Sequence, residues 1–263
     1  RRLVDSAPSP YDLKCLLRVM REEMRHGWQM SHVLVSQFGD SGKLEARKLL
    51  ERRAYKGERL LGAFNQPVDH WLDFFVYTAF IDRDGKYQLT MLHHSGFTPV
   101  ARSMGPMLKE EAFHLFTGQI GLSRVVKGGK IPTEIIQKHI NKWVSTAHDL
   151  FGKDRSTSVL RFYRWGLKGR FDGNTATGPP ADPEKLNDES RTFYHNEVKE
   201  IVDGINQLIP EGRTKLYVPD LKFNRQIGEH AGRPFDVNGN TLSADDFPRH
   251  LKDMLPGPDD LRT

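Results

Sequence analysis

Residues 21–26 read Arg-Glu-Glu-Met-Arg-His, and residues 109–114 read Lys-Glu-Glu-Ala-Phe-His. Each stretch contains Glu-x-x-His, formed by Glu23 with His26 and by Glu111 with His114. Residues three apart on a helix lie on one face, about 5–6 Å apart at Cβ, so each pair can reach one metal ion. The two motifs therefore predict two helices that direct carboxylate and imidazole ligands toward a shared interior.

A single Glu-x-x-His match carries little weight in a chain with 14 Glu and 11 His, because chance alone is expected to produce roughly 0.6 matches. Two matches, each with a doubled Glu and each on an apolar helical stripe, favour metal ligation. The alternative is that the glutamates pair with arginines such as Arg25 or Arg102, while the histidines are hydrogen-bonded core residues. For either motif alone, that alternative would be preferred.

The first motif lies within a predicted helix that starts after Ser9-Pro10, a capping residue followed by proline, and runs to about Phe38. Gly and Asp at 39–42 end this helix. Its apolar stripe has a three-and-four spacing and consists of Leu13, Leu16, Met20, Glu23, Gly27, Met30 and Leu34. A carboxylate in such a stripe costs several kcal/mol unless it is paired or bound to a metal.

Further helices are predicted over 43–53, 71–94, 99–127, 133–151, 156–171 and 190–209, with a loop at 172–183. The helix over 71–94 has Asp82 at the centre of its stripe, and the helix over 99–127 has Glu111 and His114 in the same position. Gly105-Pro106 predicts a kink, and Gly128-Gly129 predicts the end of that helix.

Asp82 belongs to Asp-Arg-Asp-Gly (residues 82–85), which also resembles a solvated turn. Its place in the stripe favours a ligand, with Asp84 as the competing candidate. His93-His94 falls at a predicted helix end, where cations suit the helix dipole, so a structural role is preferred for both.

These patterns predict an all-α protein. Residues 1–211 are expected to form a ferritin-like helical bundle, in which two helices each supply a carboxylate and two others each supply Glu-x-x-His. Residues 212–263 have little helical periodicity and carry an Asn-Gly turn signal at 237–240, so we expect a largely irregular C-terminal extension packed on the bundle, with at most a short hairpin.

The composition limits which metal ligands the chain can offer. The single cysteine, Cys15, excludes a thiolate metal cage, and such low cysteine usage is typical of proteins of the cytoplasm. Carboxylate and imidazole donors suit Fe or Mn, and we favour two Fe ions, which can share the electrons needed to reduce dioxygen. The net charge of +5 suits an anionic small substrate, whereas neither a nucleic-acid-binding face nor an apolar run of membrane-spanning length is present.

Four stretches, at residues 21–26, 82–86, 110–116 and 223–228, resemble the oxygenase components of the benzoyl-CoA 2,3-epoxidase family. The catalytic subunit of phenylacetyl-CoA epoxidase is a more distant match. The resemblance implies a ferritin-like di-iron bundle that activates O2 and epoxidises the aromatic ring of benzoyl-CoA. It also implies a separate flavin and iron–sulfur reductase that delivers electrons from NADPH.

Transferred residue by residue, the resemblance implies that Glu23 and His26 bind one iron and that Glu111 and His114 bind the other. Asp82 would be the carboxylate of the third ligand helix. The family also uses a glutamate on an earlier helix, at a position that falls before Arg1, so we expect the native N-terminus and a sixth ligand to be missing here. A phenylacetyl-CoA oxygenase and a non-catalytic ferritin-like scaffold remain the alternatives, and a homo-oligomer remains open.

Overall fold

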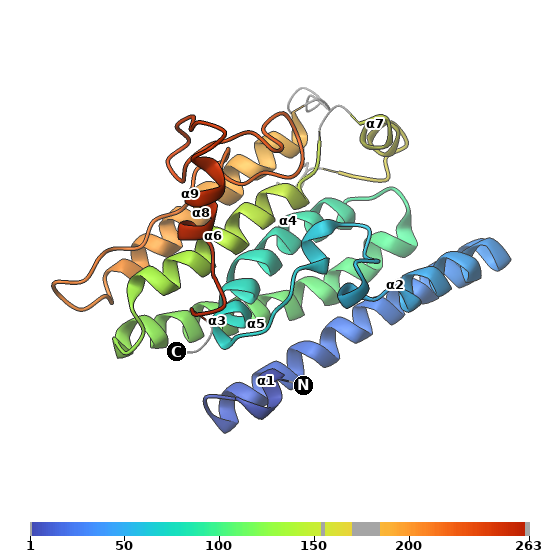
Figure 1. Ribbon diagram of the computed structural model, residues 1–263. Helices are drawn as coiled ribbons and strands as arrows, with labels where there is room; N and C mark the ends of the chain where they lie inside the picture. The colour runs from blue at the N-terminus through green and yellow to red at the C-terminus, as the bar shows by residue number, and fades with distance from the viewer. Residues whose placement is uncertain (1, 154–155, 170–184, 261–263) are drawn as a thin grey trace.

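The computed structural model describes residues 2–153, 156–169 and 185–260, which form helices and no extended strand (Figure 1). The elements, in chain order, are α1 (Arg2–Asp5), α2 (Pro10–Glu51), η1 (Ala54–Lys56), η2 (Gly62–Asn65), α3 (Trp71–Val76), η3 (Tyr77–Ile81), α4 (Asp82–His93), α5 (Thr98–Gly128), α6 (Thr133–Leu150), α7 (Thr157–Arg164), α8 (Leu186–Asn206) and α9 (Phe247–Met254). The predicted all-α class is confirmed. No helix of these described residues is both long enough and apolar enough to span a bilayer.

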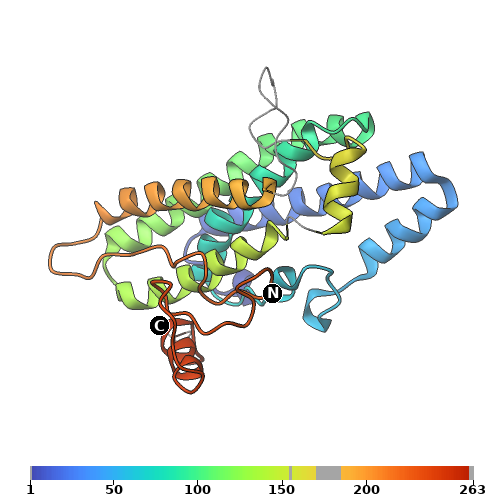
Figure 2. The ribbon, with the colours of Figure 1, turned by 90° about the horizontal axis from the view of Figure 1, so that it is seen from above.

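Helix α2 starts where the sequence predicts, because the Ser9 hydroxyl accepts a hydrogen bond from the Asp12 amide at 3.1 Å and proline follows the cap. Gly39 interrupts it with a φ of 54°, and the chain turns back on itself there (Figure 2). A Cβ on Gly42 would lie 1.9 Å from the carbonyl oxygen of Leu34, so glycine is required where the two limbs meet. The predicted break after Phe38 is therefore confirmed.

Helices α3 and α4 continue into each other through η3, a π-helical segment. Such wide turns are rare and often occur at functional sites. Asp82 is buried and lies at the first position of α4, so the alternative of a solvated turn at 82–85 is wrong.

Helix α5 lies in the middle of the bundle, between α2 on one side and the continuous α3–η3–α4 rod on the other (Figure 1). Helices α6 and α8 pack on the far side of that rod. Two glycines allow α5 to approach the rod closely: a Cβ on Gly118 would lie 2.3 Å from the Ala79 amide nitrogen, and a Cβ on Gly121 would lie 2.2 Å from the Phe75 ring. This close approach brings the mid-helix side chains of α5 next to the start of α4.

Most of the predicted boundaries hold. Helix α5 ends at Gly128 and is capped by Gly129, which takes a left-handed φ of 60°. It runs through Pro106, and the kink expected there stays a prediction. Helix α7 ends at Arg164, earlier than predicted, because Gly166 takes a left-handed φ of 66°. Helix α8 begins a few residues before the predicted start, and the predicted loop at 172–183 lies outside the described residues.

The C-terminal region is largely irregular apart from α9, which contacts α6. The Asn-Gly signal does form a tight turn, with an isolated antiparallel bridge between Phe235 and Thr241 and a φ of 82° at Gly239. The division into two parts at residue 211 stays a prediction.

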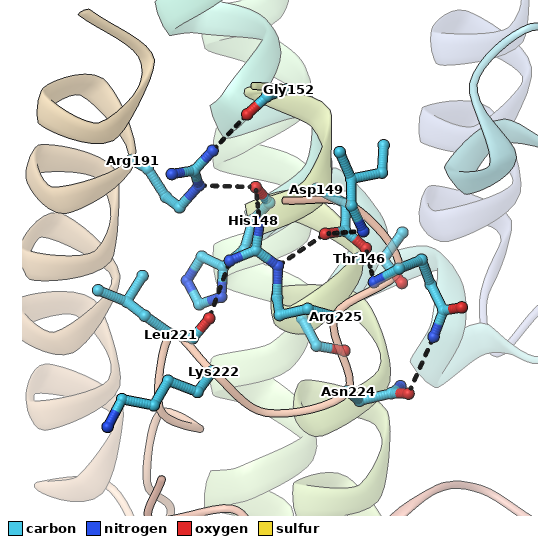
Figure 3. Close-up of polar contacts among 12 residues, drawn as sticks. Thr146, His148, Asp149, Gly152, Arg191, Leu221, Lys222, Asn224 and Arg225 are labelled. Carbon is cyan, nitrogen blue, oxygen red and sulfur yellow. Dashed lines mark hydrogen bonds and ion pairs between the residues drawn. The ribbon is translucent and has the colours of Figure 1, made fainter. Parts of the chain in front are cut away.

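Residues 223–228, one of the stretches that carry the family resemblance, dock on the end of α6 (Figure 3). The Arg225 guanidinium donates to Asp149 Oδ1 at 2.6 Å and to the His148 carbonyl at 3.2 Å. The other Asp149 oxygen accepts from the Gln226 amide at 2.9 Å. This stretch therefore fixes the C-terminal region to the bundle through buried, charge-assisted hydrogen bonds.

Candidate metal centre

All five predicted ligands come together between α2, α4 and α5. The His114 Nδ1 atom lies 3.3 Å from Glu23 Oε1 and 3.3 Å from Glu111 Oε2. Asp82 Oδ2 lies 3.7 Å from the same nitrogen. The His26 Nδ1 atom lies 3.9 Å from Glu23 Oε2 and 3.7 Å from Glu111 Oε1. Donor atoms of Glu23, Asp82, Glu111 and His114 lie within 4.8 Å of one another, close enough to hold a metal ion.

Three atoms in this cluster are buried without a hydrogen-bond partner: Asp82 Oδ2, Glu111 Oε2 and His114 Nδ1. A buried polar atom without a partner costs about 1–3 kcal/mol, and three at one point call for a common partner. Oxygen and imidazole donors without sulfur fit Fe or Mn. The residues present therefore fit a metal centre.

Electrostatics support the same conclusion. Burial, together with the charges of Glu111 and Glu23, raises the pKa of Asp82 well above its usual range. Burial also raises the pKa of Glu111, and the charge of Glu23 adds to that rise. Burial opposes protonation of His114, but Glu111 and Glu23 raise its pKa to about 10. Ionisation of these buried, closely spaced carboxyl groups is therefore unfavourable without a positive partner. A bound cation would compensate their negative charge.

The second nitrogen of each histidine bonds to a carboxylate from the opposite helix. His114 on α5 pairs through Nε2 with Glu22 of α2 at 3.1 Å, and His26 on α2 pairs through Nε2 with Glu110 of α5 at 2.8 Å. Arg18 in turn donates to Glu22 at 2.9 Å, and Arg25 contacts Glu110. Such outer carboxylates fix the tautomer and orientation of metal-binding imidazoles. Glu22 and Glu110 were not predicted; the doubled Glu of each motif was their signal.

We expect Glu22→Gln to weaken metal binding by about 10–100-fold, because the neutral amide no longer fixes and polarises His114. Calorimetric titration of the metal-free protein measures the affinity. Glu51→Gln is the matched control, since Glu51 lies on the same helix in an exposed pair with Arg47. Equal affinities in both variants would contradict the orienting role.

The sequence prediction that Glu23 sits in a buried stripe is wrong in one respect. The side chain of Glu23 is 50% exposed, whereas its neighbour Glu22 is buried. Glu23 lies at the edge of a largely apolar groove of about 670 Å³ that runs between α2 and the α3–η3–α4 rod. The groove is lined by Leu3, Val4, Leu16, Val19, Met20, Glu23, Met24, Val68, Asp69, Phe74, Tyr77, Thr78 and Asp82. The cluster is therefore enclosed on the α5 side and open on the groove side.

Asp84, the competing candidate, is buried away from the cluster and accepts a hydrogen bond from Gln88 at 3.3 Å. Between the two aspartates, Asp82 is the one whose carboxylate reaches the cluster. His93 and His94 are exposed at the end of α4, and their structural role stays a prediction.

Burial raises the pKa of Asp84 to about 8. In the unfolded chain the Asp84 carboxyl has an ordinary pKa of about 4. Between about pH 4 and about pH 8 it is therefore ionised in the unfolded chain but still protonated in the folded protein, so the free energy of unfolding falls as the pH rises. We expect Asp84→Asn to reduce the loss of stability between pH 5 and pH 8 by roughly 2–4 kcal/mol. Urea unfolding at both pH values tests this, with Asp203→Asn on the exposed face of α8 as the control. Parallel pH profiles for Asp84→Asn and wild type would contradict it.

The profile of the family described as "Phenylacetic acid catabolic protein" matches residues 19–215, which include both Glu-x-x-His motifs and Asp82. The chain belongs to this family. The match covers the helices that carry the cluster, so the ferritin-like fold predicted from the sequence is confirmed for this member of the family.

Two curated relatives are similar to this family member. Benzoyl-CoA oxygenase component B of Aromatoleum evansii is 32% identical over 305 aligned residues, which cover 99% of this chain and 64% of the relative. One of the subunits of 1,2-phenylacetyl-CoA epoxidase from Escherichia coli (strain K12) is 24% identical over 229 residues, covering 86% of this chain and 65% of the relative. The chain thus spans just under two thirds of the length of each.

Proposed function

We propose that this protein is the oxygen-activating component of a di-iron monooxygenase that converts benzoyl-CoA to its 2,3-epoxide. The observation that carries the proposal is one cluster of Glu23, Asp82, Glu111 and His114, with His26 beside it and with three unpartnered buried donor atoms. The name and the 32% identity of the benzoyl-CoA oxygenase component support the substrate class.

In this proposal, Glu23 and His26 bind one iron, Glu111 and His114 bind the other, and Asp82 supplies a carboxylate from α4. Iron bound there supplies the redox chemistry that reduces dioxygen.

The residues of the chain orient the histidine ligands and exclude water from one side of the cluster. Glu22 and Glu110 hold the two imidazoles in the tautomer that turns Nδ1 toward the centre. His114 is fully buried, so water is excluded from the α5 side of the cluster. Electrons would come from NADPH through a separate flavin and iron–sulfur reductase, and the net positive charge of the chain suits the phosphates of an acyl-CoA.

The proposal is tested by measuring the iron content of the purified protein and its oxygen uptake with reductase, NADPH and benzoyl-CoA. We expect iron bound at this cluster and formation of the ring epoxide. Phenylacetyl-CoA in the same assay distinguishes the alternative substrate, which the 24% identical epoxidase relative favours. Bound iron without oxygen uptake would instead support a non-catalytic scaffold, and absence of metal would contradict both.

A further inference from the structure

Two aromatic rings lead from the candidate metal centre toward the opposite side of the α3–η3–α4 rod. Tyr77, the first residue of the π-helical segment, lines the same groove as Glu23 and Asp82. Its ring packs edge to face against Trp143 of α6, with centroids 5.0 Å apart and an interplanar angle of 83°. Trp143 is fully buried, so Tyr77 stands between the cluster and a second oxidisable ring.

Trp143 lies next to a partly exposed side chain. The Lys142 ammonium lies 4.3 Å from the centroid of the Trp143 ring, and the Lys142 side chain is 16% exposed. The indole N–H of Trp143 donates to Asp73 Oδ1 at 2.7 Å. That oxygen also accepts from Lys142 at 3.1 Å and from His139 Nδ1 at 2.9 Å. The two rings therefore span the distance from the groove to a partly exposed lysine.

Asp73 gives the indole an ionised partner. Burial alone would raise the pKa of Asp73, but its bonds to His139, Lys142 and Trp143 lower it to about 2. The carboxylate at 2.7 Å from the indole nitrogen favours positive charge on that ring, whereas the Lys142 ammonium beside the ring, which is bonded to the same carboxylate, opposes it. What the contact supplies is a fixed acceptor for the indole proton, so that an electron can leave Trp143 while the proton is kept in the hydrogen bond to Asp73.

We propose that Tyr77 and Trp143 form a one-electron relay that carries oxidising equivalents from the metal centre to the surface when no substrate is bound. The inference rests on the proposed oxygen-activating function. Phenol and indole rings are among the most easily oxidised side chains, and an oxidising centre without substrate otherwise attacks its own ligands. The relay protects the centre rather than taking part in epoxidation.

Complete reduction of dioxygen to two water molecules takes four electrons and four protons, and the relay supplies, one at a time, the electrons that the reduced metal centre does not. Tyr77 gives one electron to the centre and its phenol proton to the water being formed. Trp143 then reduces the Tyr77 radical, which regains a proton from solvent in the groove. The indole proton stays in the hydrogen bond to Asp73 until a soluble reductant such as ascorbate returns the electron at the surface.

The simpler role for the same contacts is structural, since Asp73 joins α3 to α6. The two roles differ in what happens after oxygen exposure. We would load the protein with iron, reduce it chemically, add O2 without substrate or ascorbate, and follow oxygen uptake. Rapid freezing for electron paramagnetic resonance detects an organic radical, and peptide mass spectrometry maps oxidised tryptophan.

We expect a radical in wild type, with oxidation concentrated on Trp143 although it is buried. Tyr77→Phe should lower Trp143 oxidation several-fold and increase oxidation at the ligands His26 and His114. Ascorbate should suppress the Trp143 product in wild type. Trp71→Phe is the matched control, because Trp71 is also buried with its N–H bonded, to the Leu3 carbonyl at 3.1 Å, and should leave the Trp143 product unchanged.

Oxygen uptake with no Trp143 product, or with oxidation confined to the exposed Trp28 and Trp165, would overturn the relay while leaving the proposed function intact. Absence of oxygen uptake by the iron-loaded protein would overturn both. Because Trp143→Phe can simply destabilise the core, Tyr77→Phe is the variant that tests the relay. Its unfolding curve is recorded beside that of wild type.

Discussion

Replacement of His114 by alanine is expected to abolish oxygen uptake and to weaken metal binding by more than about 100-fold. His114 is fully buried, and its Nδ1 atom is close to Glu23, Asp82 and Glu111. The substitution removes the donor on which these three carboxylates centre. It also leaves Glu22 without its imidazole partner, so the loss exceeds that expected for Glu22→Gln.

Iron content and oxygen uptake, measured on the same preparation, test this expectation. Circular dichroism and thermal unfolding show whether the variant is folded. His32→Ala is the matched control, because His32 is an exposed histidine on α2 and should leave both quantities unchanged. A folded His114→Ala variant with wild-type iron content would refute the assignment of the metal centre.

Gly118→Ala is expected to lower the free energy of unfolding by about 3 kcal/mol, a large share of the stability of a domain. The added Cβ would lie 2.3 Å from the amide nitrogen of Ala79 and 2.6 Å from the carbonyl oxygen of Phe75. Both are backbone atoms of the α3–η3–α4 rod, so they cannot move aside as a flexible side chain would. The two elements must separate, and His114 lies one turn away from the point of contact.

Urea unfolding measures the change, and iron titration shows whether the separation disturbs the metal centre. Gly204→Ala is the control, since nothing lies within 4 Å of a Cβ at this exposed position in α8. There the substitution should stabilise the protein by up to about 1 kcal/mol, because alanine favours helix more than glycine does. A Gly118→Ala variant as stable as wild type would show that α5 and η3 can separate at little cost.

The sequence predicted the bundle and the meeting of the five candidate ligands because both follow from helical spacing. Glu23 with His26, and Glu111 with His114, share a helix face at any position in a bundle. Asp82 needed only to lie on a third helix whose stripe faces the same interior. The positions of glycine and proline predicted most of the helix ends to within a few residues of those in the structure.

The predicted stripe is right that Glu111 is buried, but in the first pair the buried glutamate is Glu22 and not Glu23. An apolar stripe has no sharp edge, and Glu22 and Glu23 differ by only about 100° around the helix axis. Which one is covered depends on how the neighbouring helices cross, which is a property of the whole bundle. The π-helical segment at Tyr77–Ile81 was equally hidden, because one wide turn changes the apolar periodicity too little to be recognised.

Helices α2 and α5 each supply a glutamate that orients the histidine of the other helix, and this pairing has a consequence for when metal can bind during folding. Neither helix by itself presents an imidazole in a fixed orientation, because the carboxylate that steers each ring belongs to the other. High-affinity capture of a cation is therefore postponed until the two rods have docked in register. Metal would then bind late in folding and would stabilise only those chains in which α2 and α5 are docked in the correct register. Chains with a wrong register would not bind it.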